Sequence, residues 1–159
     1  TTEIYTLSLH DALPICSPAP NRRPINLYQG STMLRDLALA AKAACSREDQ
    51  ESLVPLVKDL RDLGEVACKR GLLALEGELM QVRDPFLKLG IQLIVDKTEP
   101  ENVQDILDAD IYYNESNGRE LLKKIIIREG LLRIQAGDNA RNILICTKVS
   151  LGKVDPSLW

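Results

Sequence analysis

The fold is decided by the stretch Gly71-Leu72-Leu73-Ala74-Leu75-Glu76 and the later stretch Asp84-Pro85-Phe86-Leu87-Lys88-Leu89-Gly90-Ile91-Gln92-Leu93-Ile94-Val95-Asp96. Asp84 is suited to cap free backbone amides, and Pro85 loses no hydrogen bond in the first turn of a helix. Apolar residues then recur every three or four positions, which is the spacing of one helix face. The later stretch therefore predicts a helix over residues 85–96.

The same periodicity continues on both sides of these stretches. Residues from about 48 to about 82 read as one long helix that follows an N-cap at Ser46, and Pro55 is tolerated only near its first turns or as a kink. Residues 143–149 are also strand-like, so the type of the last element stays open. The remaining predicted elements are a helix over 33–45, a helix from 100 to about 107 with capping-box spacing at Thr98–Glu101, a loop over 112–118, a helix over 119–136 and a last helix from 139.

Composition favours an all-α protein, a small bundle of amphipathic helices. Hydrophobic residues make up 45% of the chain and aromatic residues only 4%, which is enough apolar material for one small domain. Lys and Arg number 20 and Asp and Glu 23, so the chain has no strong positive field to attract nucleic acid. No uncharged run is long enough to span a membrane, which takes about 20 residues.

The first fifteen residues, Thr1–Ile15, read as the in-frame translation of a common DNA sequencing adapter. A signal peptide fits them less well because it needs a basic first region, and no Lys or Arg precedes Arg22. We therefore divide the chain into an adapter-derived segment over 1–15, a Pro-containing linker over 16–31, a helical domain over 32–150 and a tail over 151–159.

The sequence predicts no enzyme, no cofactor and no metal site. The single histidine, His10, lies in the adapter-like segment, and the four cysteines show no metal-binding spacing. Walker, G-x-G-x-x-G and G-x-S-x-G motifs are missing. Asp108 and Asp110 form an acidic pair, but at a helix end such residues are usually just solvated charge.

A helical wheel of residues 48–82 separates an apolar face from a charged ridge. The apolar face contains Leu56, Leu60, Leu63, Ala67 and Ala74, and the adjoining face carries Cys68, which we expect in the core. The ridge consists of Arg61, Asp62, Glu65, Lys69 and Glu76, with Glu65 and Lys69 spaced for an i,i+4 ion pair. A solvated surface and a partner-binding surface both fit this ridge.

The two opening stretches resemble the cytoplasmic segment of the MotA/PomA family, the ion-driven stator subunits of the bacterial flagellar motor, within the MotA/TolQ/ExbB-like superfamily. In that family a G-L-L-A-L-E helix precedes a D-P-F-L-x-x-G-x-Q-L-x-x-D helix, and the resemblance covers roughly residues 53–143. Two transmembrane helices should separate the positions of Asp110 and Lys123, but here only a short loop does. The resemblance therefore implies no ion pathway in this chain.

The resemblance also implies a partner. The family segment lies in the cytoplasm and contacts the rotor protein FliG through a basic residue and the glutamate that ends G-L-L-A-L-E. The glutamate corresponds to Glu76, whereas the basic position falls on Cys68, so Lys69 and Arg70 are the candidate substitutes. We expect Glu76, Lys69, Arg70, Glu65 and Arg61 to bind a FliG-like rotor protein or other stator subunits. The alternatives are a soluble adaptor for an unknown protein and a rearranged fragment without activity of its own.

Overall fold

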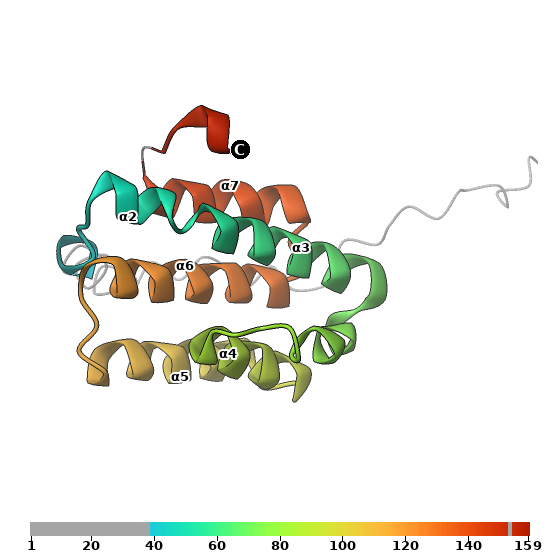
Figure 1. Cartoon of the computed structure of the whole chain (residues 1–159). Helices are drawn as coiled ribbons and strands as arrows, with labels where there is room; N and C mark the ends of the chain where they lie inside the picture. The colour runs from blue at the N-terminus through green and yellow to red at the C-terminus, as the bar shows by residue number, and fades with distance from the viewer. Residues whose placement is uncertain (1–38, 153) are drawn as a thin grey trace, which may run out of the picture.

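The computed structural model describes residues 39–152 and 154–159, and in this part of the chain every regular element is a helix (Figure 1). The all-α prediction is confirmed. The adapter-like segment, the linker and the first part of the predicted 33–45 helix lie outside the described residues. After a helical turn at residues 39–42, the elements are α2 (Arg47–Glu51), α3 (Val54–Arg70), the 3-10 helix η1 (Leu72–Glu78), α4 (Pro85–Val95), α5 (Pro100–Tyr113), α6 (Gly118–Gln135), α7 (Ala140–Leu151) and the 3-10 helix η2 (Pro156–Leu158).

Two predicted helix starts are confirmed in atomic detail. The Ser46 hydroxyl accepts a hydrogen bond from the Asp49 N–H at 3.1 Å, and the Ser46 N–H donates to the Asp49 carboxylate at 3.3 Å. Asp84 accepts from the N–H groups of Phe86 and Leu87 at 2.9 and 3.0 Å. Both caps satisfy amides that the first turn of a helix leaves without an intrahelical partner.

The single long helix predicted over residues 48–82 is wrong, because two residues break it. Pro55 has no N–H to donate to the Glu51 carbonyl, so α2 ends at Glu51 and Pro55 lies in the first turn of α3. Gly71 adopts a φ of 84°, which is favourable only for glycine, and ends α3 there. The chain continues as the separate 3-10 helix η1 rather than as more α-helix.

The region after α4 differs from expectation in two details. The helix starts at Pro100, but the capping box predicted at Thr98 does not form, because Glu99 and not Thr98 occupies the N-cap position. The helix expected to end near Leu107 runs on to Tyr113, since Leu107 and Ile111 share its buried face. The loop predicted over 112–118 is therefore shorter. The residues of uncertain type around Ile143 are helical, within α7.

Helix α6 lies at the centre of the bundle and packs against α3, α4, α5 and α7. Figure 1 shows it between α3 and α7 on one side and α4 and α5 on the other. Its fully buried side chains include Ile126, Ile127 and Leu131. Glycine permits close contact where helices cross. An added Cβ would lie 2.3 Å from Cδ1 of Ile143 at Gly64, 2.1 Å from Cδ1 of Leu131 at Gly90 and 2.9 Å from Cδ1 of Leu60 at Gly130.

Ion pairs join α5 to α6. Asp110 accepts from Lys124 at 2.6 Å, and Asp108 pairs with Arg128. All four side chains are largely buried, with exposed fractions between 13% and 27%. The expectation that Asp108 and Asp110 are merely solvated charge is therefore wrong. No helix in the described residues is both long enough and apolar enough to cross a membrane.

The last residues fold back on the bundle. Val154 and Trp159 pack against the hydrophobic core, and Nζ of Lys148 on α7 lies 4.2 Å from the centre of the Trp159 ring. The segment predicted as a tail thus has defined contacts with α7.

Candidate functional site

Three of the predicted partner-binding residues lie one helical turn apart on α3. Glu65 and Lys69 are solvent-exposed and form the expected i,i+4 ion pair. The hydrogen bond and charge of Lys69 hold the pKa of Glu65 below its usual value, and Glu65 in turn raises the pKa of Lys69. Arg61 is half-buried, and its guanidinium contacts Asp62 at 2.6 Å. These residues form one solvent-facing strip.

Glu76 does not continue that strip as predicted. It lies on η1, beyond the break at Gly71, so the rotation of 100° per residue used in the wheel does not relate it to Lys69. The prediction of one continuous charged ridge is therefore wrong. Glu76 is nonetheless solvent-exposed, on an element that packs against α3 and α4.

Cys68 is exposed rather than in the core as predicted, and its thiol lies 3.3 Å from the backbone oxygen of Asp138. The wheel was wrong because it counted η1 residues as a continuation of α3. Arg70, the last residue of α3, is also exposed. The position at which the resemblance expects a basic residue therefore faces solvent, next to two basic side chains, Lys69 and Arg70.

Arg70 lines a shallow hollow of about 500 Å³. Leu73 of η1, which is 58% exposed, lines one side of it, and Lys97 lines the other. Met80, just after η1, is 90% exposed. Leu73 and Met80 lie three residues before and four residues after Glu76 in the sequence, so this segment exposes both apolar and charged side chains.

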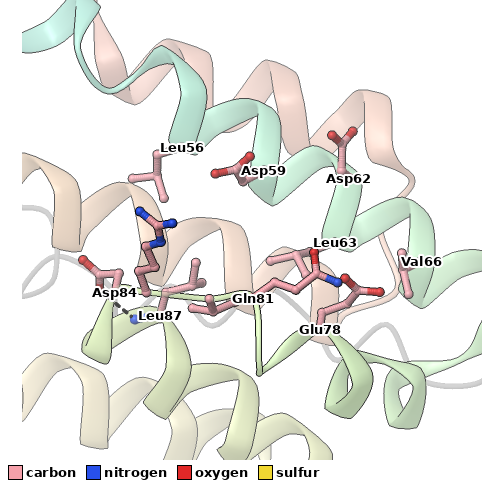
Figure 2. A pocket seen from close by; sticks show the side chains of 11 residues that line it. Leu56, Asp59, Asp62, Leu63, Val66, Glu78, Gln81, Asp84 and Leu87 are labelled. Atoms are coloured by element: carbon pink, nitrogen blue, oxygen red, sulfur yellow. Dashed lines mark hydrogen bonds between the residues drawn. The ribbon is translucent and has the colours of Figure 1, made fainter.

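A second hollow, which we call the acidic groove, lies between α3 and the segment from Glu78 to Leu87, and has a volume of about 570 Å³. Figure 2 shows Asp59 and Asp62 projecting from α3, with Glu78 and Gln81 on the opposite side. Its apolar lining consists of Leu56, Leu63, Val66, Val82 and Leu87. Sequence reasoning missed this groove, and the only signal was the i,i+3 spacing of Asp59 and Asp62.

The described residues offer little for cofactor or metal chemistry. No group of three or more His, Cys, Asp or Glu side chains in residues 39–152 and 154–159 is placed to hold a metal ion. Cys45, Cys68 and Cys146 are free thiols, and burial raises the pKa of Cys45.

The described residues form an all-helical bundle that exposes charged side chains and includes the two hollows described above. Similarity to known proteins makes the class more particular. A stretch of 65 residues is 43% identical to Motility protein A of Borreliella burgdorferi and covers 41% of this chain and 25% of that protein. A stretch of 55 residues is 34% identical to Motility protein A of Helicobacter pylori and covers 35% of this chain and 21% of that protein.

Another relative is the uncharacterised protein YtxD of Bacillus subtilis, 32% identical over 71 residues, which are 45% of this chain and 26% of that protein. No protein-family model matches the chain, and no solved structure is significantly similar to it. The chain thus spans about a quarter of the length of the curated relatives it matches. Part of the chain is thus related to Motility protein A.

Proposed function

We propose that this chain is a cytoplasmic module, similar to part of a flagellar stator subunit, that docks on a rotor protein resembling FliG through Glu76, Lys69 and Arg70. The observation that carries the proposal is the 43% identity to Motility protein A over 65 residues. Glu65 and Arg61 contribute by extending the charged surface along α3. Ion conduction and catalysis are not part of the proposal.

The geometry supports docking because the required side chains are accessible. Lys69, Arg70 and Glu76 are all exposed and lie on either side of Gly71. Charged groups at the rim of an interface chiefly set the association rate and the choice of partner. Leu73 and Met80, three residues before and four residues after Glu76 in the sequence, are exposed apolar side chains that a docked partner would bury.

The test is a graft of residues 53–110 into a stator subunit in place of its own cytoplasmic loop. Glu76→Ala should have little effect on motility, since exposed ion pairs are worth only about 0–1 kcal/mol. Glu76→Lys should impair motility more, because it replaces attraction with repulsion. A compensating charge reversal on the rotor should restore part of the loss, and added salt should weaken rotor binding in vitro.

Asp105→Lys provides the matched control. Asp105 is an exposed acidic residue on α5, away from η1, and its reversal changes the net charge by the same amount. Cys68→Arg should strengthen rotor coupling, because it puts a basic side chain at the exposed position where the family has one. If the graft works and neither Glu76→Lys nor Cys68→Arg changes motility or rotor binding, the proposed rotor contact is wrong.

A second candidate function is a helical adaptor for a different protein. It is favoured by the packing of α5 directly on α6, in which Asp110 pairs with Lys124 across the two helices. The short connection between these helices leaves no membrane helices at the point where the stator family has two. A neighbouring gene for a MotB-like partner with an ion-carrying Asp would favour the stator role, whereas an intact second stator pair in the genome would favour the adaptor.

A further inference from the structure

The acidic groove is built from α3 and the segment from Glu78 to Leu87, which face each other in the fold. Leu56, Leu63 and Val66 contribute apolar surface from α3, and Val82 and Leu87 contribute it from the opposite side. Leu56, Val66 and Val82 are only half-buried, so part of this apolar lining faces solvent. Water in contact with such surface is released when another apolar group covers it.

Acidic side chains stand on both sides of the apolar lining. Asp59 and Asp62 are one turn apart on α3, and Glu78 comes from η1 (Figure 2). Asp62 contacts Arg61 at 2.6 Å, but no ion pair in the described residues engages Asp59 or Glu78. Arg83 is the one basic residue in the described lining of the groove.

The environment of Asp59 disfavours its negative charge. Partial burial raises the pKa of Asp59, and the nearby carboxylate of Asp62 raises it further. A cation placed between these groups would relieve the repulsion and compensate for the lost hydration. The groove therefore has the charge pattern that complements a positively charged ligand with an apolar side.

We propose that the acidic groove is a docking site for a cationic amphipathic helix of a partner protein. From Leu56 to Val66 the groove follows α3 for about 15 Å, at 1.5 Å per residue, which matches about three turns of a docked helix. Apolar side chains on one face of that helix would cover Leu63, Val66 and Val82. Lys or Arg one turn apart on the same helix would then meet Asp59 and Asp62.

This inference does not depend on the rotor contact at Glu76, because it uses different side chains. The most direct test titrates the full chain with a synthetic helical peptide of about 14 residues that carries Leu on one face and Lys at i,i+3 and i,i+4 spacing on its flanks. Isothermal titration calorimetry should show one-to-one binding that weakens as salt rises from about 50 to about 500 mM. A peptide with Glu in place of each Lys should not bind.

Protein variants then locate the site. The double substitution Asp59→Asn, Asp62→Asn removes two charges at exposed positions without changing side-chain size. It should weaken the binding of the Lys peptide about tenfold. Asp105→Asn, at an exposed acidic position outside the groove, should leave the affinity unchanged. Amide chemical-shift changes on peptide addition should be largest at Val66 and Val82 and small at Lys69.

Several results would overturn the proposal. They are the absence of binding, equal binding of the Lys and Glu peptides, and unchanged affinity in the Asp59→Asn, Asp62→Asn protein. If the Lys peptide binds only after Arg22→Glu and Arg23→Glu are introduced into the full chain, the groove binds the chain's own linker, which carries these two arginines, and not a partner. Loss of motility on Glu76→Lys with unchanged peptide binding would support the rotor contact and the groove as independent sites.

Discussion

The crossing of α3 and α7 depends on the missing side chain of Gly64, and replacing it with alanine should destabilise the protein. The added Cβ would lie 2.3 Å from Cδ1 of Ile143, far inside van der Waals contact. Ile143 is fully buried and has little room to move. Overpacking of this kind costs about 1–3 kcal/mol, while Gly→Ala in a helix gains about 1 kcal/mol. We therefore expect a net loss of up to about 2 kcal/mol in the free energy of unfolding.

Urea denaturation measures this loss, followed by helix circular dichroism and by the fluorescence of Trp159, which is the only tryptophan in the chain. The m-value should stay constant, which indicates that the mutation changes stability and not the unfolded state. Ile143→Val removes Cδ1, the atom that clashes. Alone it should cost about 0.5–1.5 kcal/mol, but in the Gly64→Ala background it should cost less or restore stability.

Gly77→Ala is the matched control, since no heavy atom lies within 4 Å of a Cβ added there. It should leave stability unchanged or raise it slightly, because alanine restricts the unfolded chain. If Gly64→Ala is as stable as the original protein and shows no coupling to Ile143→Val, the close crossing of α3 and α7 is wrong.

Three further predictions concern charge and chain ends. Burial alone would raise the pKa of Asp84, but hydrogen bonds from Leu87 N–H and from Lys123 outweigh it and hold the pKa below 3.8. The charge of Asp84 therefore stabilises the fold above about pH 4. This contribution is lost as the pH falls through the folded-state pKa. Asp84→Asn, which can still cap α4, should therefore reduce the loss of unfolding free energy between about pH 5 and about pH 3 in urea titrations. Asp110→Ala should lower the unfolding free energy by about 1–3 kcal/mol at neutral pH, because it leaves the largely buried Lys124 without this carboxylate. The control Asp105→Ala, at an exposed position, should leave the unfolding free energy unchanged. Deletion of residues 1–15 should leave the thermal midpoint and helix content unchanged, and a large drop would show that they pack on the fold.

Local signals in the sequence were sufficient to predict several elements. Asp84 and Ser46 cap helices because their side chains reach amides only two or three residues away, and such interactions depend on nothing distant. The type of α7 was harder to predict, because the β-branched residues Ile143, Ile145 and Val149 also suit a strand. Its packing against α3 and α6 supplies the contacts that select a helix.

The charged surface was predicted less well than the helices. The helical wheel assumes a constant rotation per residue, and a single residue with positive φ, Gly71, invalidates it. Because of that error, the wheel placed Cys68 in the core and put Glu76 on the same helix face as Lys69. The pairs that join Asp110 to Lys124 and Asp108 to Arg128 link separate helices, so they require knowledge of how α5 packs on α6. A sequence pattern within α5 alone or α6 alone does not contain that information.

The break at Gly71 also changes how the candidate site should be understood. On one continuous helix, the relative position of Lys69 and Glu76 would be fixed by the helix pitch. Here it is set by one glycine whose φ is 84° and by the packing of η1 on α3 and α4. Because no heavy atom lies within 4 Å of a Cβ added to Gly71, the conformation requires glycine for its backbone and not for space. The turn at Gly71 therefore sets the relative position of the charges that a partner would contact. The resemblance in G-L-L-A-L-E concerns this glycine turn as much as Glu76, the last residue of the stretch.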